Sequence, residues 1–261
     1  MSDLIRECRI LTRNFIDSDS TITPSKGGDV LNLYDRDNDS LYLTVGAKRD
    51  TITADIEIIF KEGSTETEVT FNNFIMLNTN VKNFTFYKYQ SGVYVEAFTH
   101  TVPVGRKYIS VAFGNITTSR IKVSLHSTQY KFNQEKEVGE MIVSRLRYVL
   151  SQNPVSYNRQ DRETKSIITL ADGSEHVAFT RFSDNRVSKY GASVGFSLMP
   201  QEDYDFLEIL KNEGQPFLWW PEHDVRPQQI YFVNWVNAFT ANYTTTFKGA
   251  GYDLTMELRE V

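Results

Sequence analysis

Apolar and polar residues alternate with a period of two along most of the chain. The first half contains six such stretches, at residues 56–60, 68–71, 84–89, 93–95, 108–113 and 121–125, and a continuous apolar run at residues 74–77 that is typical of a buried segment. Short turns with Gly or Ser separate them, and the turns recur at intervals of about eight to twelve residues. This pattern predicts antiparallel strands that bury one face, packed as a β-sandwich. No stretch before residue 134 has the spacing of an amphipathic helix.

The second half shows the same alternation and adds one helix. Its predicted strands lie at residues 145–150, 194–198, 216–220, 230–235 and 254–258. Between the second and third of these, Pro200 and the acidic residues that follow it are typical of a helix start, and Leu207 and Leu210 form an apolar face. Gly214 is a stop signal, so we expect a short helix near residues 200–213.

A charged segment with a glycine, residues 134–143, separates the two halves. We therefore expect a mainly β protein with two antiparallel β-sandwich domains. The first would span residues 1–133 and the second, with the helix, residues 144–261. Residues 134–143 would be the connector between them, either extended or as a short helix.

Composition narrows the functional classes. The chain has 261 residues and a formal net charge of −5, without a long Lys/Arg block, which argues against a nucleic-acid surface. No apolar run approaches the roughly 20 residues of a membrane span, and the first residues lack a signal-peptide core. Cys8 is the single cysteine, which fits synthesis in a reducing compartment. We expect a protein made in a cytoplasm.

The densest polar motif is the loop that contains Asp35, Asp37 and Asp39. Alternate carboxylates can converge on Ca²⁺, which prefers oxygen ligands. The loop lacks the Gly and Glu that an EF-hand requires at its sixth and twelfth positions, where Ser40 and Gly46 stand instead. A single Ca²⁺ in a sandwich loop and a solvated acidic turn both remain open; we expect no other cofactor.

The adjacent pair Trp219 and Trp220 is the most concentrated aromatic patch. Neighbours in a strand point to opposite faces, so we expect one indole in the core and the other against a partner. A protein interface is favoured over a stacked sugar. The four histidines, His100, His126, His176 and His223, have no metal spacing, and no nucleophile motif or phosphate loop is present, so the sequence offers no enzyme chemistry.

Residues 28–130 resemble a galactose-binding-like (discoidin-type) jelly-roll. The resemblance is carried by residues 32–37 (NLYDRD), 75–78 (IMLN), 81–86 (VKNFTF) and 119–123 (SRIKV). The family's tryptophan after the acidic loop is absent, and Tyr42 stands nearby as a candidate ligand aromatic. The resemblance implies a β-sandwich that can bind a glycan.

Residues 133–142 and the C-terminal half resemble structural proteins of tailed-bacteriophage tails. The C-terminal carriers are residues 217–222 (FLWWPE), 231–235 (YFVNW) and 251–261 (GYDLTMELREV). The resemblance implies a non-enzymatic virion protein that assembles as a homo-oligomeric ring or adaptor in a tail or baseplate, with other tail proteins as partners. It implies no catalytic residues.

Two functions follow from the sequence. The first is a structural component of a phage tail or tail-like particle, located in the virion. The alternative is a carbohydrate-binding module that recognises a host surface glycan. An enzyme ranks last. A ring component should be oligomeric, whereas a free module should bind sugars.

Overall fold

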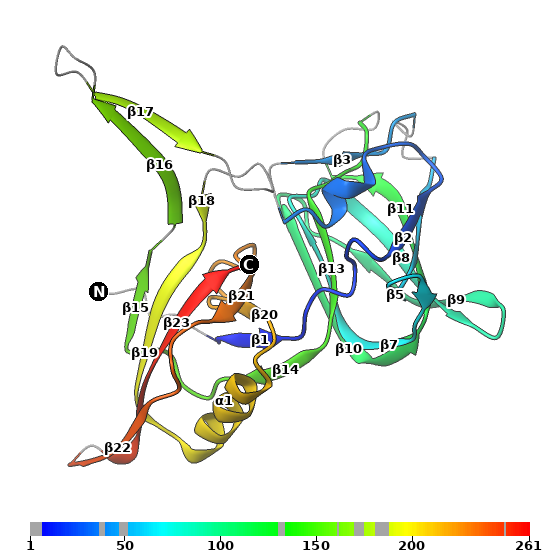
Figure 1. Cartoon of the computed structure of the whole chain (residues 1–261). Coiled ribbons are helices and arrows are strands. Elements are labelled where there is room, and N and C mark those ends of the chain that lie inside the picture. Colours follow the sequence, from blue (N-terminus) through cyan, green and yellow to red (C-terminus); the bar gives the residue numbers. More distant parts are fainter. Residues whose placement is uncertain are drawn as a thin grey trace. The chain divides into compact units, whose positions relative to one another are not determined.

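The computed structural model describes residues 7–36, 40–46, 52–129, 134–160, 162–169, 175–180, 188–247 and 249–261. The chain divides into two compact units (Figure 1). One, the inserted unit, is residues Arg13–Leu146; the other, the split unit, combines Met1–Thr12 with Arg147–Val261. Both are built mainly from antiparallel strands, which confirms the predicted mainly β class.

The inserted unit contains a five-stranded and a three-stranded antiparallel sheet. The five-stranded sheet has the order β2 (Thr21–Pro24), β4 (Ala54–Ile59), β11 (Arg120–Thr128), β8 (Val81–Gln90) and β9 (Val93–Thr101). The three-stranded sheet has the order β10 (Tyr108–Thr118), β7 (Val69–Leu77) and β13 (Glu140–Ser144). The remaining elements are the pair β3 (Tyr42–Leu43) and β12 (Glu137–Val138), the hairpin β5 (Lys61–Glu62) and β6 (Thr65–Glu66), and the 3-10 helix η1 (Val30–Leu33).

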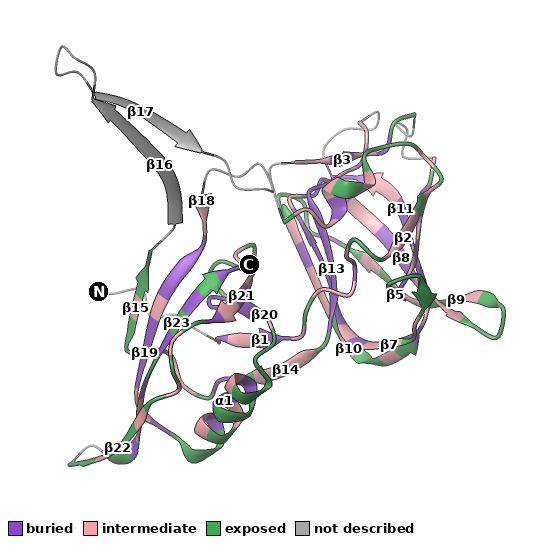
Figure 2. Ribbon diagram, viewed as in Figure 1, coloured by how far each residue is buried: buried purple, intermediate pink, exposed green. Residues whose placement is uncertain are grey.

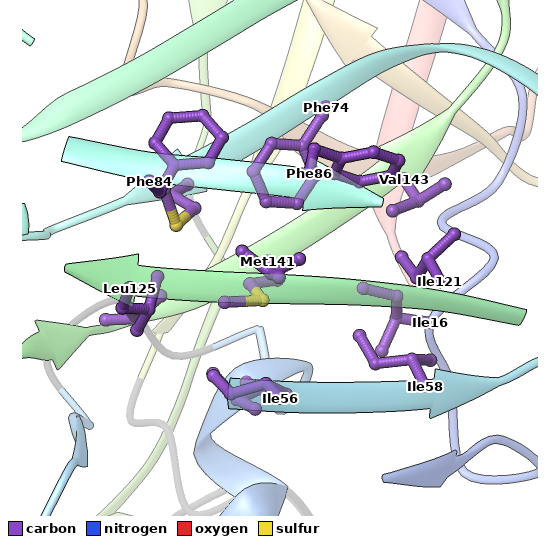
Figure 3. Close-up of a cluster of buried hydrophobic side chains, with 14 of the residues drawn as sticks. Ile16, Ile56, Ile58, Phe74, Phe84, Phe86, Ile121, Leu125, Met141 and Val143 are labelled. Carbon is purple, nitrogen blue, oxygen red and sulfur yellow. The ribbon is translucent and has the colours of Figure 1, made fainter. Parts of the chain in front are cut away.

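The core of the inserted unit follows from the alternation along these strands, which Figure 2 shows as buried and more exposed bands. Ile56 and Ile58 on β4 point inward with the apolar side chains of β11 and β8, and β7 and β13 supply Phe74, Met76, Met141 and Val143 (Figure 3). Phe86 lies at the centre of an aromatic cluster. Burial of these large side chains is the main stabilising term of the unit.

The split unit is organised on one eight-stranded antiparallel sheet. Its order is β14 (Leu146–Val149), β1 (Arg9–Leu11), β20 (Phe217–Trp220), β21 (Tyr231–Trp235), β23 (Gly249–Glu260), β19 (Gly191–Met199) and β15 (Ser156–Arg159), with β22 (Ala241–Thr246) also paired to β23. A smaller sheet consists of β17 (Glu175–Thr180), β16 (Arg162–Thr169) and β18 (Ser188–Lys189).

The predicted helix is confirmed as α1 (Gln201–Glu213). Pro200 is its N-cap rather than its first residue, and Gly214 ends it in the left-handed conformation with φ of 63°. Leu207 and Leu210 are buried in the core of the split unit, as the apolar spacing predicted. Among the described residues, no helix combines the length and apolar character needed to cross a membrane.

The predicted domain boundaries are wrong in two respects. Residues 134–143 are not a connector, because they contain β12 and most of β13, and β13 pairs with β7 from Glu140 to Ser144. Residues 1–12 do not belong to the first sandwich, because β1 pairs with β20. The physical reason is burial: Val138, Met141 and Val143 are fully buried, whereas the charges of this segment had suggested an exposed link.

Candidate functional site

The outer face of the five-stranded sheet carries a row of charged and aromatic residues that crosses four strands. Glu57 on β4 lies opposite Lys122 on β11, and Lys122 lies opposite Tyr87 on β8. Tyr87 in turn lies opposite Glu96 on β9. Cross-strand partners share a face, and the alternate positions of these strands point into the core. The row therefore faces away from the core.

A second pair of tyrosines extends this row into a cluster. Tyr89 lies opposite Tyr94, and their rings meet edge to face with centroids 5.4 Å apart. The Lys122 ammonium lies 4.5 Å from the centroid of Tyr87 and 5.1 Å from that of Tyr94. The guanidinium of Arg120 lies 5.0 Å from the centroid of Tyr89. We call these five residues the tyrosine face; each is half-buried.

The charge of Arg120 is compensated within the unit. Glu66 accepts hydrogen bonds from Arg120 Nε at 2.8 Å and from Nη2 at 2.6 Å, and also one from Ser119 Oγ at 2.5 Å. These bonds, first those of Arg120, lower the pKa of Glu66 to about 2. A bidentate pair of this kind fixes the guanidinium over the Tyr89 ring.

The charge of Lys122 is not compensated in this way. Within the part of the chain that the structure describes, Lys122 has no carboxylate within ion-pair distance. Glu57, its cross-strand neighbour, accepts a long hydrogen bond from the Tyr94 hydroxyl at 3.4 Å. Burial, followed by the charge of Glu57, raises the pKa of Tyr94 to about 12. Glu96 accepts from Thr99 Oγ1 at 3.1 Å. The ammonium thus contacts tyrosine rings rather than an acid.

Next to the tyrosine face, short polar side chains form a hydrogen-bonded network on the same sheet. Ser124 Oγ donates to Asp55 at 2.5 Å. His126 connects Thr53, 3.2 Å from Nδ1, to Thr85, 2.9 Å from Nε2, and Thr85 contacts Thr99 at 2.9 Å. These groups satisfy one another, so the open chemistry of the sheet is concentrated in the tyrosine face.

Of the predicted calcium ligands, Asp37 and Asp39 lie outside the described residues. Asp35 is described, half-buried, and accepts a hydrogen bond from Ser40 Oγ. The proposed calcium site therefore remains a prediction.

The three predicted ligand or interface aromatics are all buried. Trp219 and Trp220 are each 0% exposed, as is Tyr42. The expectation that one indole faces outward is therefore wrong for this chain. Trp219 belongs to the core, and the far side of the strand is covered because the His223 ring packs on Trp220, with centroids 4.4 Å apart. Tyr42 donates to the Lys26 carbonyl at 2.7 Å, a structural role.

Among the residues that the structure describes, one group of acidic and imidazole side chains comes together, at Glu7, His223 and Asp224 of the split unit. His223 Nδ1 lies 2.8 Å from an Asp224 carboxylate oxygen and 3.6 Å from one of Glu7. Arg9 also donates to the same Glu7 oxygen at 2.7 Å. The Arg9 guanidinium thus pairs with Glu7, so one of the three side chains already has a cationic partner.

Part of the tyrosine face could have been predicted from the sequence, from the alternation of phenylalanine and tyrosine within residues 84–89. In residues 84–89 the phenylalanines Phe84 and Phe86 occupy the buried face, whereas Tyr87 and Tyr89 carry hydroxyls and point outward. Phenylalanine at one set of alternate positions and tyrosine at the other indicates that the first set faces the core and the second faces solvent, because the tyrosine hydroxyl needs a hydrogen-bond partner. The positions of Lys122 and Arg120 beside these tyrosines depend on the register of β11 against β8, which the sequence alone does not determine.

No family model matches the chain, and no curated protein matches it. Solved structures similar to part of it include a family 32 carbohydrate-binding module, CBM32-3, from a family 31 glycoside hydrolase of Clostridium perfringens. That module is 15% identical in sequence, with a TM-score of 0.41. The match covers 50% of this chain and 92% of the module. A family 32 module from Streptococcus pneumoniae EndoD is 10% identical, with a TM-score of 0.41. Here the match covers 51% of this chain and 99% of the module.

A third similar structure is CpGH89CBM32-5 from Clostridium perfringens, described in complex with GalNAc-β-1,3-galactose. It is 13% identical, with a TM-score of 0.38 and coverages of 48% and 94%. Against a larger protein, a Ruminococcus gnavus GH29 fucosidase, the identity is 14%, the TM-score is 0.41 and the coverage is 51% of this chain. The match spans only 27% of the fucosidase.

Proposed function

We propose that the inserted unit is a glycan-binding module without catalytic activity and that the tyrosine face is its binding surface. The observation that carries the proposal is the gathering of Tyr87, Tyr89 and Tyr94 with two cations on one open sheet face. A sugar ring presents an apolar C–H face and a rim of hydroxyls. Aromatic rings bind the first, and charged side chains bind the second.

The geometry suits a shallow site rather than a deep pocket. Glu57 and Glu96 lie at the two ends of the row that contains Lys122 and Tyr87, so acceptors and a donor flank the aromatic surface. These groups can exchange their bonds to water for bonds to sugar hydroxyls. Such sites bind weakly per sugar and gain strength from repeated copies.

A glycan array with the full chain tests the proposal, with GalNAc-β-1,3-galactose among the neutral probes. Any saccharide bound on the array is then titrated by calorimetry against the chain and against Tyr87→Ala and Tyr94→Ala. Each substitution should weaken binding roughly twofold to tenfold, because one aromatic contact contributes about 0.5–1.5 kcal/mol to the binding free energy.

Tyr243→Ala is the matched control, because Tyr243 is 62% exposed and lies in the split unit. It should bind as the unchanged chain does. The proposal fails if no saccharide binds, or if the tyrosine-face variants bind as tightly as the control while melting at the same temperature.

A second function, a structural subunit of a phage tail or similar particle, is supported by a different feature. The hairpin formed by β22 and β23 exposes Tyr243, and Phe247 at its tip is 97% exposed. These exposed aromatic side chains near the turn of the hairpin are candidate contacts for a neighbouring subunit.

Light scattering across a range of protein concentrations tests this second function. A closed oligomer that Phe247→Ser dissociates would support it. Val225→Ser is the control, because Val225 is 55% exposed and lies outside the hairpin. A monomer at every concentration, with no change on adding the other proteins of a candidate particle, would contradict it.

A further inference from the structure

We propose that the tyrosine face selects saccharides that carry a single anionic group, a carboxylate or a sulfate, and that Lys122 is the residue that recognises it. This inference rests on the proposed glycan-binding function and specifies its ligand class. It starts from the difference between the two cations of the face.

Arg120 and Lys122 stand two positions apart on β11, so they share the outer face. Arg120 is held by two hydrogen bonds to Glu66, and its charge is neutralised. Lys122 has no acid partner among the described residues, and its ammonium lies 4.5 Å from the centroid of Tyr87 and 5.1 Å from that of Tyr94. Of these two cations, Lys122 is the one whose charge is left for a ligand.

The position of the ammonium makes it suited to an acidic sugar. A pyranose ring packed on Tyr87 or Tyr94 would place a substituent of the ring within reach of a cation that is about 5 Å from both centroids. A lysine ammonium is a compact charge on a flexible stem, so it can turn from the rings to an anion. A carboxylate and a sulfate offer the same charge-assisted acceptor.

The surrounding acids set an upper limit on the ligand's charge. Glu57 and Glu96 flank the Lys122 row on β4 and β9. A second anionic group on the ligand would approach these carboxylates and be repelled. The face therefore favours one negative group per bound sugar unit over densely sulfated chains.

The test compares three probes with the full chain by calorimetry: lactose, sialyllactose, and lactose with one sulfate on the galactose. At least one of the two acidic probes should bind about tenfold or more tightly than lactose, because a hydrogen bond to a charged group contributes about 1.5–3 kcal/mol. Their advantage should shrink with added salt because part of the interaction is exposed.

Variants assign the effect to Lys122. Lys122→Gln should weaken binding of the acidic probes far more than binding of lactose, so that their advantage is lost, and Lys122→Arg should retain most of it. Lys107→Gln, an exposed lysine in the loop before β10, should change nothing. A sulfate-only or carboxylate-only preference identifies the anion and still supports the inference.

The inference is overturned if lactose binds as tightly as the acidic probes, or if their advantage survives Lys122→Gln. It is also overturned if none of the three probes binds while the array shows other saccharides bound, and in that case the glycan-binding proposal stands. If the array shows no bound saccharide at all, the glycan-binding proposal itself fails.

Discussion

Phe86 is the residue whose removal should damage the inserted unit most. Its ring stacks on Phe98 at 5.1 Å with 4° between the planes and also contacts Phe74 at 5.0 Å, Phe71 at 6.0 Å and Phe113 at 6.0 Å. It is 0% exposed. Phe86→Ala removes roughly 150 Å² or more of buried surface, about 4 kcal/mol at 25 cal/mol per Å². Measured Phe→Ala costs in cores are about 3–5 kcal/mol.

The upper half of that range is expected, because several rings lose a partner and the strands cannot close the gap. Domains are stable by about 5–15 kcal/mol in total, so the loss is a large fraction. In urea, a loss of about 4 kcal/mol lowers the unfolding midpoint by roughly 2 M.

Far-UV circular dichroism measures this transition. The three tryptophans, Trp219, Trp220 and Trp235, all lie in the split unit, so fluorescence follows that unit separately. Phe247→Ala is the control for loss of a phenyl ring without loss of burial. A cost for Phe86→Ala below about 1 kcal/mol, or equal to that of the control, would refute the reasoning.

Three further predictions concern single side chains. The lowered pKa of Glu66 means that its contribution to stability is present above the unfolded pKa of about 4.5 and is lost as pH falls towards 2. Glu66→Gln should therefore flatten the dependence of the melting temperature on pH in this range. The change should be small because a third of the Glu66 side chain is exposed. Gly214→Ala should cost about 1 kcal/mol, seen as a lower melting temperature, because the C-cap has φ of 63°; an unchanged melt would contradict this. Cys8 is buried, and burial raises the pKa of its thiol to about 12. A thiol reagent at neutral pH should therefore label Cys8 at least tenfold faster in denaturant than in the folded chain. Equal labelling rates would contradict this prediction and show that the folded chain exposes the thiol.

The sequence predicted the type of each element better than the connections between them. The helix near residues 200–213 was predictable because Pro200, the leucine spacing and Gly214 act locally. The pairing of β1 with β20 was not, since the strand has three residues and its partner lies far along the chain. The charges of residues 134–143 indicate a linker, but Lys136 is fully buried and donates to the Ile52 carbonyl at 2.9 Å, so the segment belongs to the fold.

The candidate site was the part least accessible from the sequence. The motifs that stand out in the sequence are short and local: the acidic loop and the Trp219–Trp220 pair. The tyrosine face depends on four strands brought into register, and no short segment contains it. Only the outward placement of Tyr87 and Tyr89 was readable locally, from their alternation with buried phenylalanines.

The discontinuity of the split unit has a consequence for synthesis on the ribosome. β1 lies between β14 and β20 in the sheet, and β20 is made about 210 residues after β1. At translation rates of about 5–20 residues per second, β1 waits roughly 10 to 40 s for β20, and until then Ile10 and Leu11 lack the partner on that side of the strand. The inserted unit, complete at residue 146, can fold during that interval. The nascent chain therefore carries the apolar side chains of β1 without their full set of partners while the inserted unit folds, and a holdase chaperone that covers these side chains should raise the yield of correctly folded protein.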